Sequence, residues 1–61
     1  MKKVKRFVDK NEVMQKALDL QDEGWHNPNI VFHKDREERY FIIRVMAIDN
    51  FFLLREDGSF E

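Results

Sequence analysis

The chain has 61 residues, no cysteine and a formal net charge of −1, although 38% of its residues are charged. This length predicts a single domain spanning residues 1–61, and the lack of cysteine excludes disulfides and thiolate metal ligands. The near-neutral charge disfavours a general nucleic-acid coat. No apolar run reaches the roughly 18–20 residues that cross a bilayer, and the basic opening lacks the apolar stretch of a signal peptide. We therefore expect a cytoplasmic protein with no membrane segment.

A domain this small buries only about 60% of the surface that its unfolded chain exposes, so its stability is marginal. Small folds often compensate by self-association, and we expect a homo-oligomer, most simply a homodimer. The two histidines, His26 and His33, are too few for a closed zinc site. We expect neither a metal nor a cofactor.

The N-terminal part predicts a strand and then the start of a helix. Residues 2–8 mix basic with β-branched and aromatic side chains, which is typical of an edge strand protected against mispairing. Asp9 is a candidate N-cap, and Glu12 stands three residues later, as in a capping box. Val8 and Val13 have the spacing of a hydrophobic staple across the helix start.

The helix itself is expected over residues 10–23. Its apolar positions form one stripe with helical spacing: Val13, Met14, Ala17, Leu18 and Leu20. Gly24 stands where a left-handed residue ends a helix, and Trp25 is then expected to pack back on Leu20 in a Schellman ending.

The C-terminal part predicts three strands separated by polar turns. The strands are expected over residues 30–34, 39–48 and 51–55, with Asp49-Asn50 as a tight two-residue turn. Asp57-Gly58 predicts one more turn, before a tail or strand stub. The expected fold is α+β: a β-α-β-β-β domain with one helix on one face of a four-stranded, mostly antiparallel sheet. The first strand should join an edge in parallel.

These turns predict which side chains share a face, because neighbours along a strand point to opposite sides. One face is wholly apolar and should form the core under the helix: Ile30, Phe32, Phe41, Ile43, Val45, Ala47, Phe52 and Leu54. The other face has no second helix to cover it, yet it is mostly apolar. Its apolar members are Val31, Ile42, Met46, Ile48, Phe51 and Leu53. A large exposed apolar patch usually marks a contact site, so we expect an interface here.

The same register places Arg44 opposite Arg55, with Tyr40 and His33 nearby on the open face. Directly opposed like charges are mildly destabilising. The pair is easier to explain if both forked donors hold a carboxylate or phosphate. The plainer interpretation, that both arginines are solvated or pair with glutamates of a dimer mate, carries more weight.

The chain contains few side chains suited to catalysis, and we expect no catalytic residue. Ser59 is the only serine, and there is no threonine, cysteine or glycine-rich phosphate loop. The first functional hypothesis is a non-enzymatic binding protein that self-associates or inhibits a host protein. The chain is very short and rich in charged and aromatic residues. This composition suggests a phage or mobile-element inhibitor of a host factor or defence system, but no motif supports this.

Two alternatives remain open. The first is a ligand sponge that binds a phosphorylated or nucleotide-like small molecule in a dimer cleft. The second is a single-stranded nucleic-acid-binding module that stacks bases on Tyr40, Phe51 and His33. The neutral net charge makes nucleic acid the less favoured partner.

Overall fold

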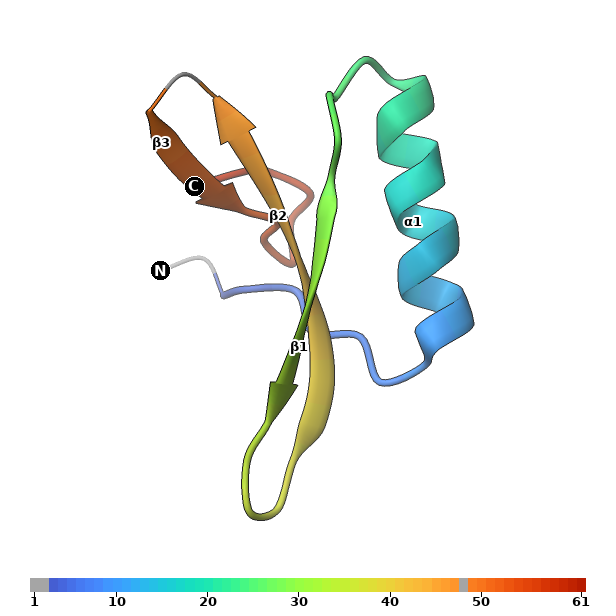
Figure 1. The fold of residues 1–61 in the computed structure, drawn as a ribbon, viewed down its shortest axis with the longest axis vertical. Coiled ribbons are helices and arrows are strands. Elements are labelled where there is room, and N and C mark those ends of the chain that lie inside the picture. The colour runs from blue at the N-terminus through green and yellow to red at the C-terminus, as the bar shows by residue number, and fades with distance from the viewer. Residues whose placement is uncertain (1–2, 48) are drawn as a thin grey trace.

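The computed structural model describes residues 3–47 and 49–61. In chain order the elements are α1 (Lys10–Asp22), β1 (Asn29–Lys34), β2 (Arg39–Ala47) and β3 (Asn50–Leu53). The three strands form one antiparallel sheet in the order β1-β2-β3 (Figure 1). The fold is therefore α+β, as expected, but the expectation of a four-stranded sheet is wrong.

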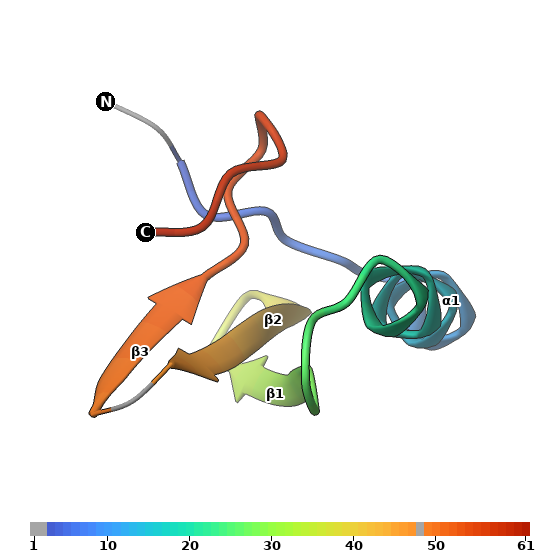
Figure 2. The ribbon, with the colours of Figure 1, turned by 90° about the horizontal axis from the view of Figure 1, so that it is seen from above.

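The missing strand is the N-terminal segment, residues 3–8. It makes two isolated antiparallel bridges, Val4 with Arg55 and Phe7 with Phe41, and not the parallel ladder expected from the sequence. Phe7 exchanges two backbone hydrogen bonds with Phe41, at 2.8 and 2.6 Å. The segment thus crosses from the edge of β2 to the chain that follows β3, as Figures 1 and 2 show. A β-ladder forms only where successive residues of two strands run side by side. A segment that crosses from one strand to another therefore makes isolated bridges instead.

The start of α1 confirms the expected N-cap. The Asp9 side chain accepts a hydrogen bond from the backbone N–H of Asn11 at 2.9 Å, which satisfies one of the free donors of the first turn. The hydrophobic staple is wrong, because Val8 is 81% exposed while Val13 is fully buried. Val13 lies on the side of the helix that faces the sheet and the core. Val8 precedes the helix, and its side chain is exposed to solvent.

The end of α1 is a Schellman motif. Gly24 has φ +110°, its N–H donates to the Gln21 carbonyl, and the Trp25 N–H donates to the Leu20 carbonyl, both at 3.1 Å. Trp25 also packs on Phe60, with ring centroids 4.3 Å apart. The helix end is therefore tied to the C-terminus of the chain.

The β1–β2 register is the one that the turn pattern predicted, from Ile30 opposite Ile43 to His33 opposite Tyr40. The β2–β3 register is not. Ala47 pairs with Asn50, so the turn is centred one residue earlier than expected and every pairing moves by two positions. Arg44 consequently faces Leu53. A shift of two residues keeps each side chain on its expected face, because the side-chain period of a strand is two.

The chain after β3 forms a second, shorter hairpin, residues 53–61, which we call the C-terminal hairpin. Leu53 and Glu61 exchange backbone hydrogen bonds at 2.8 and 3.1 Å, and the Arg55 N–H donates to the Ser59 carbonyl at 2.8 Å. Gly58 turns the chain with φ +88°. The expected turn at this point is confirmed, and of the two alternatives for the residues after it, a tail or a strand stub, the Leu54–Phe60 bridge fits the stub.

The core lies between the sheet, α1 and the C-terminal hairpin. Its buried members are Phe7, Val13, Leu20, Ile43, Val45 and Leu54. Phe41, Ala17 and Phe60 pack against this group, half-buried. The expected core face is thus covered only in part: Ile30 and Phe32 on β1 remain 39% and 53% exposed. α1 lies on the β1 side of the sheet, where it packs against β1 and β2 and not against β3, and a helix this short leaves Ile30 and Phe32 partly accessible.

Candidate functional site

The candidate interface is the sheet surface opposite the helix, which we call the open face. In Figure 2, α1, the N-terminal segment and the C-terminal hairpin all lie on one side of β1 and β2. No element among residues 3–47 and 49–61 lies on the other side. By the observed registers, the open face carries Val31, His33, Tyr40, Ile42, Arg44, Met46, Phe51 and Leu53.

Its apolar side chains differ in how far they reach into solvent. Met46 and Phe51 face each other across β2 and β3 and are 57% and 59% exposed. Val31, Ile42 and Leu53 are half-buried between their strand neighbours. The predicted interface residue Ile48 lies outside the described residues. The most exposed apolar surface is therefore at the β2–β3 end of the open face.

Arg44 lies beside this apolar pair. Its guanidinium carbon sits 4.7 Å from the centre of the Phe51 ring, a cation–π arrangement. Its Nε atom is buried and has no hydrogen-bond partner among the described residues. The Nε of Arg55 is in the same state, so this feature does not distinguish Arg44 as a binding residue; its place beside the exposed Phe51 ring does.

Arg55 does not join Arg44, and the predicted Arg44–Arg55 pair is wrong. Arg55 lies beyond the end of β3, where it bridges to Val4, and its guanidinium donates to the Glu61 carbonyl at 3.2 Å. The cause is the two-residue change of register, which places Leu53 opposite Arg44. A two-arginine anion clamp is therefore not formed, and the ligand-sponge hypothesis loses its geometric basis.

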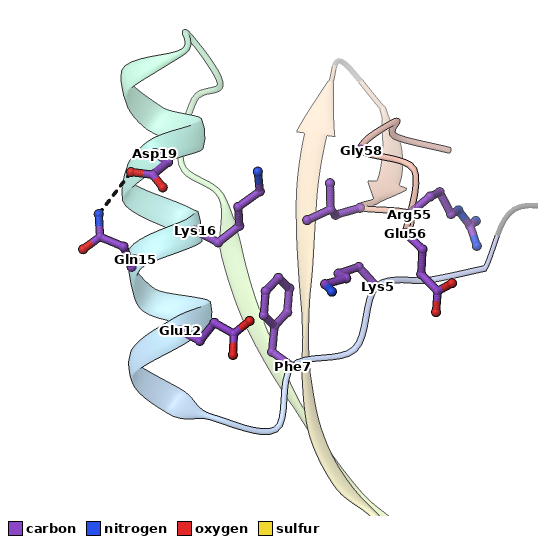
Figure 3. A pocket seen from close by; sticks show the side chains of 10 residues that line it. Lys5, Phe7, Glu12, Gln15, Lys16, Asp19, Arg55, Glu56 and Gly58 are labelled. Atoms are coloured by element: carbon purple, nitrogen blue, oxygen red, sulfur yellow. Dashed lines mark hydrogen bonds between the residues drawn. The ribbon is translucent and has the colours of Figure 1, made fainter.

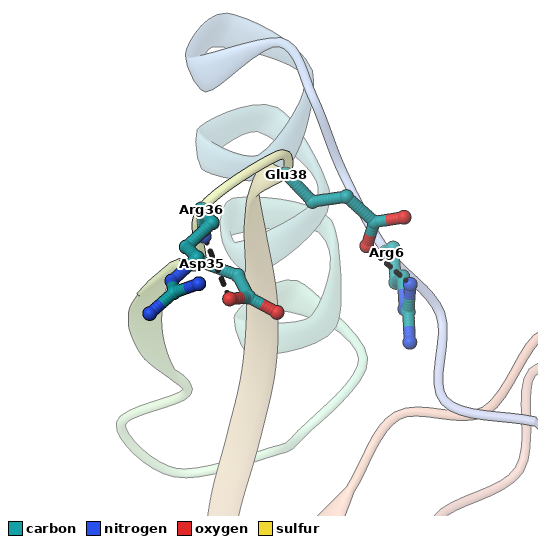
Figure 4. A network of polar contacts seen from close by, with 4 residues as sticks. All are labelled: Arg6, Asp35, Arg36 and Glu38. Atoms are coloured by element: carbon teal, nitrogen blue, oxygen red, sulfur yellow. Dashed lines mark hydrogen bonds and ion pairs between the residues drawn. The ribbon is translucent and has the colours of Figure 1, made fainter.

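Tyr40 and His33 do lie together. Their rings stack with centroids 5.2 Å apart and planes only 15° apart. The Arg6 guanidinium carbon lies 4.5 Å from the centre of the same Tyr40 ring. Arg6 also pairs with Glu38 at 2.9 Å, shown in Figure 4 beside the Asp35–Arg36 turn. The result is a row of three planar side chains, from β1, β2 and the N-terminal segment, in which His33 and Tyr40 are stacked.

Sequence reasoning missed Arg6 as a member of this row, because residues 2–8 were assigned to a strand with solvated basic side chains. The alternation of side chains along an extended segment could have identified Arg6. Phe7 is buried in the core, so its neighbour Arg6 must point to the opposite side.

A groove of about 470 Å³ runs between α1 and the C-terminal hairpin (Figure 3). Phe7 and Leu54 contribute apolar surface to it. Its charged side chains are Lys5, Lys16 and Arg55 against Glu12, Asp19 and Glu56. This balance gives no preference for a ligand of either sign. Ser59 lies nearby in the chain, but its hydroxyl donates to Asp57 at 2.6 Å within the hairpin turn.

A second groove, which we call the helix–β1 groove, has a volume of about 800 Å³ and contains no Lys, Arg, Asp or Glu. It lies where the outer side of α1 meets the start of β1. Its lining is Met14, Ala17, Leu18, Gln21, His26, Asn27, Pro28, Asn29, Ile30 and Met46. Met14 and Leu18 were expected in the core, yet they are 47% and 55% exposed.

Comparison with protein-family models, with curated proteins and with solved structures finds no match to this chain. No helix in the described part of the chain is long and apolar enough to cross a membrane. Within the same residues, no three His, Asp or Glu side chains gather as a metal site would need. A functional proposal therefore stands on the surfaces described above.

Proposed function

We propose that the protein is a non-enzymatic binding protein whose open face docks on another protein. The observation that carries this proposal is the exposed pair Met46 and Phe51 beside half-buried Leu53, on a sheet face that no described element covers. A contiguous apolar patch on a water-soluble fold usually marks a contact site, and aromatic side chains dominate such interfaces.

The charges of the open face specify the partner further. Arg44, His33 and Arg6 lie on it, and Arg6 is already paired with the Glu38 carboxylate. Arg44 lies over the Phe51 ring and makes no ion pair within the described residues. The complementary surface is therefore apolar and supplies a carboxylate to Arg44, since charge-assisted hydrogen bonds from arginine to carboxylate are the strong ones.

Binding of this kind would occlude the partner's own surface, so the protein acts as an inhibitor or adaptor of a cytoplasmic protein of its host. The test is affinity capture from the native host, read by mass spectrometry, with wild type and Phe51→Glu compared. A partner captured by wild type is expected to be lost with Phe51→Glu. Lys10→Glu is the control, because Lys10 is exposed in the first turn of α1 and belongs neither to the open face nor to the helix–β1 groove.

A partner that Phe51→Glu and Met46→Glu both retain would remove the open face from the binding site. Both variants must first show the circular dichroism spectrum of wild type. This is expected, because both side chains are more than half exposed in the folded state.

One observation favours a second candidate, single-stranded nucleic acid. The row of Arg6, Tyr40 and His33 offers planar surfaces of the kind on which unpaired bases stack. Fluorescence anisotropy with labelled oligonucleotides at low salt tests it, because phosphate contacts are strongest there. Binding that Tyr40→Ala abolishes would support this candidate, and no binding at low salt would dismiss it.

A further inference from the structure

The apolar stripe of α1 is wider than the surface that the sheet covers. At about 100° per residue, its members from Leu20 through Val13 to Leu18 span an arc of about 160°. Leu20 and Val13 are buried, but Met14 and Leu18, at the other side of the arc, are 47% and 55% exposed. Figures 1 and 2 show α1 lying over the outer edge of β1. The side of the helix that carries Met14 and Leu18 therefore lines the helix–β1 groove and projects beyond the last described strand.

The outer edge of β1 has free backbone groups at the same place. Along an antiparallel pair, residues alternately exchange hydrogen bonds with the neighbouring strand and turn their N–H and C=O away from it. Phe41 uses both groups on Phe7, at 2.8 and 2.6 Å, so it does not exchange them with Phe32, which lies opposite. The N–H and C=O of Phe32, and of Ile30 two residues earlier, therefore point outward from the sheet. No strand among the described residues pairs with this edge.

We propose that an extended segment of a partner protein adds to the β1 edge as a new outer strand, beneath α1. Its backbone exchanges hydrogen bonds with Ile30 and Phe32, as extended peptides do when they add to an unpaired strand edge. Its side chains on the helix side fill the helix–β1 groove under Met14 and Leu18. One segment thereby satisfies the free backbone groups of β1 and covers the exposed side of the helix.

The position of α1 restricts what the occupant is. A second copy of this chain that paired its own β1 here, with its helix on the same side, would bring a second α1 into the space of the first. A partner strand that carries its own helix on that side meets the same obstacle. The occupant is therefore a bare extended segment, such as a tail or a long loop, of a different protein.

The charges around the groove specify the sequence of this segment. The groove lining contains no Lys, Arg, Asp or Glu, so the side chains that enter it are uncharged and apolar. Asp22 lies one turn after Leu18, and the last turn of α1, described in full, contains no basic residue. A Lys or Arg at that end of the segment compensates Asp22 and the negative end of the helix dipole. The segment thus combines alternating apolar residues with a basic residue at one end.

The helix–β1 groove is continuous with the open face. Met46 lines the groove and also belongs to the open face, where it lies opposite Phe51. If the proposed function holds, one partner covers both surfaces, and its extended segment leads from Met46 along β1. The strand site has its own backbone donors and acceptors, so it does not depend on that function.

Selection from a phage-displayed library of short random peptides tests the site before the partner is known. Wild-type protein should enrich peptides that alternate β-branched or aromatic residues and carry a basic residue at one end. The most enriched peptide, made synthetically, should bind Leu18→Glu at least about thirtyfold more weakly than wild type and Phe51→Glu within about twofold of wild type. The absence of any enriched sequence would overturn the strand site. A peptide released by Phe51→Glu and retained by Leu18→Glu would also overturn it, while the open-face proposal would stand.

Amide hydrogen exchange, followed by NMR with the same synthetic peptide, tests the backbone pairing. The peptide should slow exchange of the Ile30 and Phe32 amides at least about tenfold and change little at Val31, whose N–H already donates to β2. Two further peptides, N-methylated at odd or at even positions, need no protein variant. Only one of them should lose affinity, because alternate residues of an added strand direct their N–H groups to β1. Equal affinities of the two, or unchanged exchange at Ile30 and Phe32, would contradict strand addition.

Discussion

The indole of Trp25 packs on the ring of Phe60, with centroids 4.3 Å apart and planes tilted by 44°. Trp25 stands immediately after the glycine that ends α1, and Phe60 belongs to the C-terminal hairpin. The contact therefore joins two segments that no strand pairing connects within residues 3–47 and 49–61. It also closes one end of the core, since Phe60 packs against the buried group that includes Leu20 and Leu54.

Replacement of Phe60 by alanine should destabilise the protein by about 2–3 kcal/mol, somewhat less than for a fully buried phenylalanine. Trp25 is the only tryptophan, so its emission reports the change directly and should shift to longer wavelength. Urea unfolding followed by fluorescence measures both effects. Phe51→Ala is the control, because Phe51 is 59% exposed on the open face and its loss should cost less than about 1 kcal/mol.

The Gly24→Ala variant should destabilise the protein by about 1–2 kcal/mol for a purely conformational reason. Gly24 has φ +110°, and a Cβ placed there would meet no atom within 4 Å. The cost therefore comes from the backbone angle alone. Thermal unfolding by circular dichroism measures it. An unchanged midpoint would mean that the Schellman ending relaxes into another turn without loss.

The adjacent residues Leu53 and Leu54 should respond differently to alanine. Leu54 is 2% exposed in the core, so its truncation should cost about 2–5 kcal/mol. Leu53 is half-buried on the open face, so its truncation should cost clearly less while weakening partner binding. Denaturant unfolding of both variants checks the assignment of faces. Equal losses of stability would indicate that the assignment of Leu53 and Leu54 to opposite faces of the sheet is wrong.

Of the two arginines, Arg44 should matter for binding and Arg55 should not. Arg44→Gln removes the cation that stacks on Phe51 and leaves partner affinity reduced at least about tenfold, as expected for a lost charge-assisted contact. Arg55→Gln removes a contact to the Glu61 carbonyl and should act on the C-terminal hairpin only. Calorimetry with the captured partner compares them. A larger effect at Arg55 would place the binding site elsewhere.

The surface ion pair of Arg6 and Glu38 should contribute little to stability. The side chains are 56% and 59% exposed, so solvent and salt screen the pair, and a double-mutant cycle should give less than about 1 kcal/mol. Removal of Arg6 alone should affect any ligand stacked on Tyr40 more than it affects folding. A coupling energy well above that limit would show that the pair is a folding determinant.

Local patterns in the sequence were sufficient for α1, its N-cap, its glycine ending and the β1–β2 hairpin. Each depends on residues close in the chain: Asp9 and Asn11, Gly24 and Leu20, or the polar turn that follows Lys34. The faces of β3 were also predictable. The turn is displaced by one residue, which moves the β2–β3 pairing by two positions. Each side chain therefore stays on its predicted face of the sheet.

The tertiary structure decided what depends on distant segments. Whether residues 3–8 form a strand depends on the direction in which they cross β2, and that direction is set by the burial of Phe7 under α1. Which part of the wide helical stripe is covered depends on how α1 tilts on the sheet, so Val13 is buried and Leu18 is not. The sequence determined which side chains could share a face, because strand and helix periods are local; only packing in three dimensions determined which of those faces remained open.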